Sequence, residues 1–399
     1  MVDESPVATK CAMYSHAKNL DVEVLRAFAV VSVVIGHAGA LFVWGSPAMN
    51  WLAQHFGLWA GVDLFFAISG FVITKGLYDQ LSRADTKSER TRVLIAFWTR
   101  RVYRILPSAV LWLSIGLLLT VLFNRSGTFG GLRGNLTDAI ASLLQIADVH
   151  YYQCLTLHID TCGSTRVFGP YWSLSLEEKF YLVLPIAIIF LGGRLRVAML
   201  IAIAVQVLMP RPILGLAWYL RTDAFLIGSL LALESGSVIH QEVRPTVLNA
   251  KFGKMIPWAA YALLLITAAP FQIVPIYLGI VAILSGILVW IASYGSGYVV
   301  GRGLFRTALA WIGTRSYAIY LIHMPSFYVT REFWYRMSGP DVHFDGTYTL
   351  RFIVTAIGLI VVFAELNYRF IETPIRRLGA RRSASILARA ESHHVAQNV

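Results

Sequence analysis

A histidine and an aspartate occupy neighbouring apolar runs of the sequence, where an ionisable side chain costs free energy and is a candidate for function. His37 lies towards the end of the run 24–44, and Asp63 lies near the start of the run 57–77. In antiparallel helices the two side chains would lie at similar depth. An aspartate fixes the tautomer and raises the basicity of an adjacent imidazole, so the pair suits a general base that deprotonates a hydroxyl group. A packed core histidine, or a neutral polar pair joining two helices, is the structural alternative.

Further polar residues occur at comparable depth in later apolar runs. Glu177 and Glu178 are adjacent near the start of the run 172–192, so they project about 100° apart on a helix and only one is expected to face the site. We expect Glu178 to be the catalytic carboxylate and Lys179 to neutralise its neighbour. A polar cavity in the outer half of the membrane would gather the predicted substrate-binding residues, which are Trp172, Glu177, Arg221 and His323. For His323, support of helix packing is the alternative role.

Arginines form a second candidate site at the opposite, cytoplasmic edge. Arg101 and Arg104 stand at positions i and i+3, and therefore project from one helical face. Guanidinium groups bind phosphates through paired hydrogen bonds, so this face suits a phosphate-bearing donor. Arg26 precedes His37 by eleven residues, which places both on one face of a helix and about 16 Å apart in height. Alternatively, these arginines are ordinary anchors at the cytoplasmic membrane surface.

The elements that must position these residues are membrane-spanning helices. The 399-residue chain is 57% hydrophobic and 14% charged, whereas a soluble globular chain carries about 25% charged residues. A spanning helix needs roughly 20 apolar residues. The sequence therefore predicts an all-α, polytopic membrane bundle of ten spans: 24–44, 57–77, 105–123, 172–192, 197–211, 218–234, 257–271, 274–293, 307–330 and 349–369.

Lysine and arginine set the predicted orientation of this bundle. With the N-terminus inside, the cytoplasmic segments contain 22 Lys and Arg residues and the opposite loops contain 5. Cytoplasmic loops of membrane proteins are enriched in these residues, so both termini are expected in the cytoplasm. The predicted organisation is a cytoplasmic N-terminal segment 1–23, a transmembrane domain 24–377 with an external loop 124–171, and a cytoplasmic tail 378–399.

Charge and cysteine content argue against other classes. The net charge is +12, but no basic stripe with interleaved aromatic residues occurs, so the excess is assigned to cytoplasmic loops and not to nucleic-acid binding. The polar first 23 residues do not form a cleaved signal peptide. The three cysteines, Cys11, Cys154 and Cys162, show no metal-ligand spacing, and no metal is expected. Cys154 and Cys162 share the predicted external loop, and the sequence leaves open whether they form a disulfide.

Ordered motifs along residues 20–377 resemble the membrane acyltransferase-3 family, which includes bacterial O-antigen and exopolysaccharide O-acetylases. Each motif is weak alone, but the ordered set is specific. The motifs are Arg26 with His37, Gly61-Val-Asp63-Leu-Phe-Phe-Ala-Ile-Ser-Gly70-Phe71, Arg101-x-x-Arg104-Ile-x-Pro107, Trp172-Ser-Leu-Ser-Leu-Glu177-Glu178-x-Phe180-Tyr181, Ser316-Tyr317-x-x-Tyr320-x-x-His323-x-Pro325 and Tyr368-Arg-Phe-Ile-Glu372-x-Pro374.

The resemblance implies a helical membrane domain that takes its acyl group from cytoplasmic acyl-CoA, with acetyl-CoA as the expected donor. It implies that the histidine matching His37 is essential, and that the arginines matching Arg26, Arg101 and Arg104 help to hold the CoA phosphates. The expected acceptor is a hydroxyl of a cell-surface or lipid-linked carbohydrate, such as lipopolysaccharide, at the bacterial inner membrane. Direct transfer and an acyl-histidine intermediate both stay open. Some relatives carry a hydrolase-like domain after the membrane part, for which this chain is expected to have no room.

A proton-coupled transporter or exporter of a small solute or acyl-sugar is the main alternative, because intramembrane His, Asp and Glu also build proton relays. Transporters often contain inverted repeats, and no such repeat is visible here. The arginine pair also suits phosphate better than a neutral solute. A lipid- or glycan-binding scaffold without turnover is the third interpretation. Labelled acetyl on a glycan, as opposed to solute accumulating in vesicles, distinguishes the enzyme from the transporter.

Overall fold

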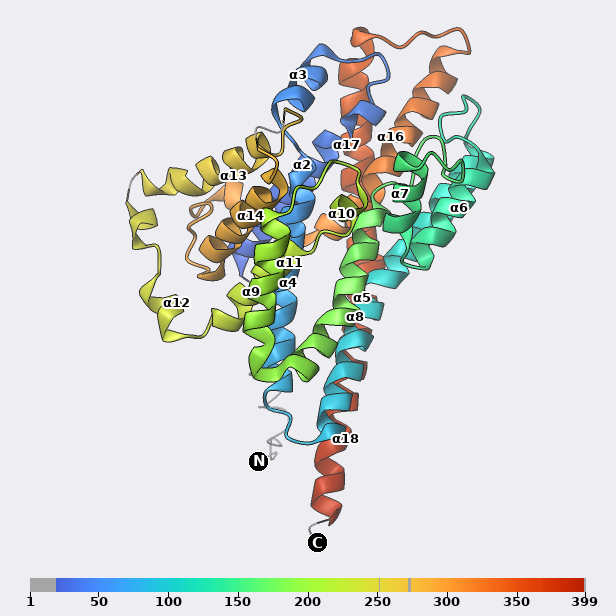
Figure 1. Cartoon of the computed structure of the whole chain (residues 1–399). Coiled ribbons are helices and arrows are strands. Elements are labelled where there is room, and N and C mark those ends of the chain that lie inside the picture. The colour runs from blue at the N-terminus through green and yellow to red at the C-terminus, as the bar shows by residue number, and fades with distance from the viewer. Residues whose placement is uncertain (1–18, 251, 272–273, 398–399) are drawn as a thin grey trace, which may run out of the picture.

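The chain folds as a bundle of helices (Figure 1). This computed structural model describes residues 19–250, 252–271 and 274–397. Every regular element in these residues is a helix, which confirms the predicted all-α class. Cys11, most of the predicted segment 1–23 and the last two residues of the predicted tail lie outside the described residues.

Long apolar helices dominate the described part of the chain. Two shorter apolar helices lie at Gly253–Thr267 and Tyr277–Ser293. These helices confirm a polytopic membrane bundle, whereas the number of ten spans, the orientation and the domain limits stay predictions. The six helical segments that are long and apolar enough to cross a membrane are Leu20–Ala40, Ala60–Leu81, Lys87–Leu122, Tyr171–Leu208, Leu216–Glu234 and Gly346–Ala388.

The helices that position the candidate site are α2 (Leu20–Gly36), α4 (Ala60–Leu81), α5 (Lys87–Leu122), α8 (Tyr171–Leu191) and α16 (Ser316–Ser338). The other α-helices are α3 (Pro47–His55), α6 (Leu132–Leu143), α7 (Ala147–Thr156), α9 (Leu195–Leu208), α10 (Leu216–Tyr219), α11 (Asp223–Glu234), α12 (Val238–Glu242), α13 (Ile256–Thr267), α14 (Tyr277–Ser293), α15 (Leu304–Thr314), α17 (Thr349–Leu366) and α18 (Thr373–Gln397).

The helix α5 begins well before the predicted span 105–123. The Thr86 hydroxyl accepts a hydrogen bond from the Glu89 amide, and the Glu89 carboxylate accepts one from the Thr86 amide, each at 3.2 Å. This reciprocal cap starts the helix in the polar segment before the membrane. As a result Arg101 and Arg104 project from one continuous helix, which packs along α18 at the lower end of the bundle (Figure 1).

Two other predicted elements differ in the structure. The predicted span 307–330 is divided at Arg315 into α15 and α16, because the Arg315 amide bonds the Ile312 carbonyl three residues back and its guanidinium pairs with Glu365 of α17. The predicted external loop 124–171 contains two helices, α6 and α7. The first difference involves a polar contact between segments that are distant in sequence.

Two glycines bring α4 and α11 into backbone contact. A Cβ atom on Gly70 would lie 2.1 Å from the carbonyl oxygen of Phe225, and one on Gly228 would lie 2.0 Å from the carbonyl oxygen of Ala67. Small residues at such crossings allow helices in membranes to pack closely. This contact holds the α4 helix, and with it Val62 and Asp63, at a fixed distance from α11.

Replacing Gly70 with alanine is expected to destabilise the protein by about 1–3 kcal/mol, because the new methyl group overpacks a backbone contact. Gly76→Ala is the matched control, since it lies on the same helix and its Cβ would meet nothing within 4 Å. Thermal unfolding of the detergent-purified variants tests the difference. A melting temperature that falls equally in both variants would contradict the close contact.

Candidate active site

Two cavities lie at successive levels along α2. The inner cavity is marked by Arg26 and the outer cavity by His37. Val62 and Tyr320 line both cavities. The polar residues lining the inner cavity are Arg26, Ser69, Arg104, Ser173, Glu177, Glu178, Tyr181, Ser316, Tyr317 and Tyr320. The outer cavity is mainly apolar, and its side chains include Val33, His37, Met49, Phe56, Trp59, Trp172 and Trp218.

The inner cavity contains an arginine that forms no direct ion pair with a described carboxylate. Arg104 lines the cavity and makes no hydrogen bond or ion pair with any described residue. Arg26 also lines it, but donates to the Glu23 carboxylate at 2.8 Å. Arg101 does not line the cavity: its guanidinium carbon lies 5.3 Å from the centre of the Tyr181 ring, which borders it. The predicted donor-binding arginines therefore gather at this level, with Arg104 the most available for an anion.

Both glutamates line the inner cavity, which differs from the expectation that one faces the site beside His37. Glu177 accepts hydrogen bonds from the Ser69 hydroxyl at 2.6 Å and from the Tyr181 hydroxyl. Glu178 has no hydrogen bond or ion pair with the described residues. Trp172, at the start of α8, lines the outer cavity. Glu177 and Glu178 follow it by five and six residues, and therefore lie about 8–9 Å further along the helix, at the level of the arginines.

Lys179 does not neutralise either glutamate, so that prediction is wrong. Its ammonium group donates to both carboxylate oxygens of Asp148 on α7, each at 2.6 Å. The contact ties α8 to α7. Lys179 therefore does not neutralise the two carboxyl groups that line the inner cavity.

His37 lines the outer cavity and is paired with His323, which is fully buried and lines neither cavity, so the predicted contact of His323 with substrate is not seen. Nδ1 of His37 lies 2.9 Å from Nε2 of His323, and Nδ1 of His323 lies 3.3 Å from the carbonyl oxygen of Ile319. A carbonyl only accepts, so His323 carries its proton on Nδ1 and accepts on Nε2. His37 must then donate through Nδ1, which leaves a lone pair on its Nε2. No described residue forms a hydrogen bond with Nε2 of His37. This nitrogen is therefore available as a base.

Asp63 is not the partner of His37, contrary to the predicted pair. Its two carboxylate oxygens accept hydrogen bonds from the Arg221 guanidinium at 2.8 and 2.9 Å, and both residues are about 1% exposed or less. Val62 faces the cavities, and the next helical residue points about 100° away from it. Asp63 is thereby turned towards α11 and away from His37.

Arg221 lines neither cavity, although it was expected to bind substrate. Its guanidinium carbon lies 4.2 Å from the centre of the Trp218 ring, 5.1 Å from Trp172 and 5.3 Å from Trp59. These three indoles line the outer cavity. Arg221, held by Asp63, thus supports an aromatic wall from behind. The buried indole N–H of Trp218 has no hydrogen-bond partner among the described residues.

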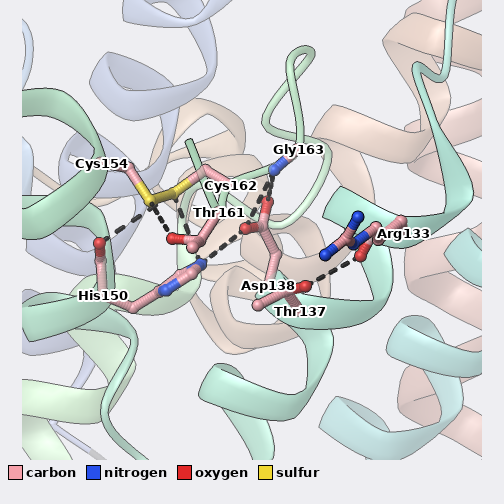
Figure 2. The surroundings of a disulfide bond; sticks show 8 residues. All are labelled: Arg133, Thr137, Asp138, His150, Cys154, Thr161, Cys162 and Gly163. Carbon is pink, nitrogen blue, oxygen red and sulfur yellow. Dashed lines mark hydrogen bonds and ion pairs between the residues drawn. A yellow bond between two sulfur atoms is a disulfide. The ribbon is translucent and has the colours of Figure 1, made fainter. Parts of the chain in front are cut away.

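A disulfide links Cys154, near the end of α7, to Cys162 in the loop that follows this helix (Figure 2). The Asp138 carboxylate lies 2.8 Å from Nε2 of His150 and accepts from the Gly163 amide, which anchors the disulfide loop to α6. In the described residues, His150 and the two cysteines form a group that is close enough to share a metal ion. Metal binding requires thiolates, and both sulfur atoms are already used in the disulfide.

Several site residues were not predicted from the sequence. Trp59 and Trp218 line the outer cavity, and Tyr320 and Val62 line both cavities. Tyr320 and Val62 fall within the motifs that carry the family resemblance, which was an available signal. Trp218 gives no such signal, because it approaches the cavity only through the short helix α10.

A comparison with known families defines the class. A family model described as an acyltransferase domain matches residues 19–365. This range covers most of the 399 residues, and the chain belongs to this acyltransferase family. The resemblance seen in the sequence motifs is confirmed.

Individual relatives are O-acetyltransferases by name. The chain is 29% identical over 389 residues to YrhL of Bacillus subtilis, provisionally named a peptidoglycan O-acetyltransferase, with 90% of this chain and 55% of YrhL covered. It is 28% identical to the peptidoglycan O-acetyltransferase OatA of Listeria monocytogenes, with 92% and 57% covered. It is 27% identical to the O-acetyltransferase OatA of Staphylococcus aureus, with 92% and 58% covered.

The chain therefore spans a little more than half the length of these curated relatives. No solved structure shows significant similarity to it.

Proposed function

We propose that this protein is a membrane O-acetyltransferase that moves acetyl from cytoplasmic acetyl-CoA to a carbohydrate hydroxyl on the outer side. The observation that carries the proposal is the pair of adjoining cavities, one lined by Arg104 and the other by His37, whose guanidinium and Nε2 form no hydrogen bond with a described residue. Arginine suits the phosphates of the donor, and an aromatic wall suits the apolar faces of a sugar ring. Membership of the acyltransferase family supports the same chemistry.

In the proposed reaction the CoA moiety occupies the inner cavity, with Arg104 and Arg26 near its phosphates. The acceptor hydroxyl lies beside His37 in the outer cavity. Nε2 of His37 takes the hydroxyl proton while the oxygen attacks the thioester carbonyl carbon. The carbon–sulfur bond then breaks, and the sulfur leaves with CoA and takes up one proton. Glu178, which lines the inner cavity, is the carboxyl group assigned to deliver that proton.

The acceptor proposed for this chain is peptidoglycan, because two of the relatives are named for that polymer. Their names favour it over the lipopolysaccharide or exopolysaccharide that the sequence resemblance implied. The proposed location is the bacterial inner membrane, with the inner cavity open to the cytoplasm. The excess of Lys and Arg on that side supports this orientation.

Membranes from a host without the activity, carrying the full chain, test the proposal with radiolabelled acetyl-CoA and added peptidoglycan. We expect label on the glycan that mild alkali removes, as it does for an ester but not for an amide. Membranes without the chain are the control. If no label is transferred and sealed vesicles instead accumulate a solute in proportion to the chain, the protein is a transporter and the proposal fails.

Replacing Arg104 with glutamine is expected to raise the KM for acetyl-CoA about 10- to 100-fold, because a charge-assisted hydrogen bond contributes about 1.5–3 kcal/mol. A smaller effect is expected on the rate at saturating donor. Arg92→Gln, on the same helix and remote from the cavity lining, is the control. Steady-state kinetics at varied acetyl-CoA measures both values. An unchanged KM would remove Arg104 from the donor site.

A further inference from the structure

The two cavities adjoin each other at two shared lining residues, one from each of two helices. Val62 of α4 and Tyr320 of α16 are the described residues that line both the inner and the outer cavity. Each is only 5% exposed. The place between these two side chains is therefore the candidate passage from one cavity to the other.

Tyr320 is held on both its hydroxyl and its ring. The hydroxyl donates to the Pro170 carbonyl at 3.0 Å and lies 2.6 Å from the Ser173 hydroxyl. The ring packs edge-on against Phe65, with ring centres 6.2 Å apart. A side chain fixed in this way in a close-packed interior does not swing aside. Tyr320 is the rigid wall of the opening.

Val62 stands on a backbone that is also fixed. At the preceding Gly61, a Cβ atom would lie 2.5 Å from the carbonyl oxygen of Ala29, so α4 is pressed against α2 at this point. The width of the opening therefore depends on the Val62 side chain itself. Alanine, which lacks both valine γ-methyl groups, or isoleucine, which has one additional carbon, changes the width without a change in the helix positions.

We infer that Val62 and Tyr320 together select the acyl group by size and admit acetyl in preference to longer chains. The inference rests on the proposed function. The thioester reaches the opening from the inner cavity, and the acceptor hydroxyl and His37 meet it from the outer cavity. The new carbon–oxygen bond forms and the carbon–sulfur bond breaks with the acyl carbons between Val62 and Tyr320. Longer chains need space that the valine methyl groups occupy.

The purified full chain in lipid nanodiscs provides the test, with acetyl-, propionyl- and butyryl-CoA as donors and soluble peptidoglycan fragments as the acceptor probe. Initial rates give the ratio of butyryl to acetyl transfer for each variant. We expect Val62→Ala to raise this ratio about tenfold or more and Val62→Ile to lower the propionyl to acetyl ratio, since one methylene in a tight apolar site changes selectivity roughly 10- to 200-fold.

The matched control is Val33→Ala, because Val33 is a buried valine that lines the outer cavity alone. It is expected to leave both ratios within about twofold of wild type, which is small against the shift expected for the opening. The opposite directions expected for Val62→Ala and Val62→Ile guard against a general loss of folding, since a misfolded variant loses all donors together.

The outcomes separate this inference from the proposed function. If wild type transfers acetyl but neither Val62 variant changes the ratios, or Val33→Ala changes them equally, the size filter is wrong and the acetyltransferase stands. If wild type transfers no acyl group from any donor, the proposed function fails and the inference fails with it. Ratios that move in the two expected directions only at Val62 support the filter.

Discussion

Replacing His37 with alanine is expected to lower the rate of acetyl transfer by a factor of about 100 to 10,000, the range that general base catalysis supplies. The KM for acetyl-CoA is expected to change little, because His37 lines the outer cavity and not the inner one. The rate at which labelled acetyl is transferred to glycan, at matched protein level and saturating donor, measures this loss of activity. His55→Ala is the control, since His55 is exposed on α3 and lines neither cavity.

The histidine pair makes this prediction more specific. A glutamine at position 323 retains an oxygen that can accept from Nδ1 of His37, whereas an alanine removes the acceptor and releases the tautomer. We therefore expect His323→Gln to retain more activity than His323→Ala. Full transfer by His37→Ala would exclude the proposed mechanism. Equal activity of the two His323 variants would exclude the tautomer argument alone.

Replacing Asp63 with alanine is expected to destabilise the protein by about 3–5 kcal/mol, because it leaves the Arg221 charge buried without a partner. Both side chains are almost wholly buried. The melting temperature of the detergent-purified protein reports the loss, and Asp79→Ala, at an exposed position of the same helix, is the control. Because Arg221 also supports the tryptophan wall, transfer is expected to fall in the variant even at temperatures where it remains folded.

A double variant tests whether the pair of Asp63 and Arg221 stabilises the fold only because each charge neutralises the other. When both members of a buried pair become apolar, stability often returns. Asp63→Leu combined with Arg221→Met is therefore expected to unfold at a higher temperature than Asp63→Ala. A double variant that is less stable than the single one would show that the pair stabilises the fold by more than mutual neutralisation.

The motifs of the sequence predict the helical bundle, the family and the separation between an arginine level and a histidine level. Those features depend on apolar length and on distances along one helix, which the sequence contains directly. The partner of Asp63 depends on the rotation of α4 relative to α11, which is set by the glycine contacts at Gly70 and Gly228. The partner of His37 lies 286 positions away in sequence, and no local pattern identifies it.

The division of the predicted span 307–330 could not be foreseen for a similar reason. Arg315 interrupts an otherwise apolar pattern, and its carboxylate partner Glu365 belongs to a helix later in the chain. The helices in the loop 124–171 are short and polar enough to read as a connector. For Arg315 the decisive contact joins segments that are remote in sequence.

The disulfide between Cys154 and Cys162 also bears on how the protein sits in its membrane. Disulfides persist in oxidising compartments and are rare in the reducing cytosol. The disulfide therefore favours a placement of α7 and its neighbour α6 on the side of the membrane away from cellular thiol reductants. Sulfur chemistry thus favours the same orientation as the distribution of lysine and arginine, from a property that is independent of charge.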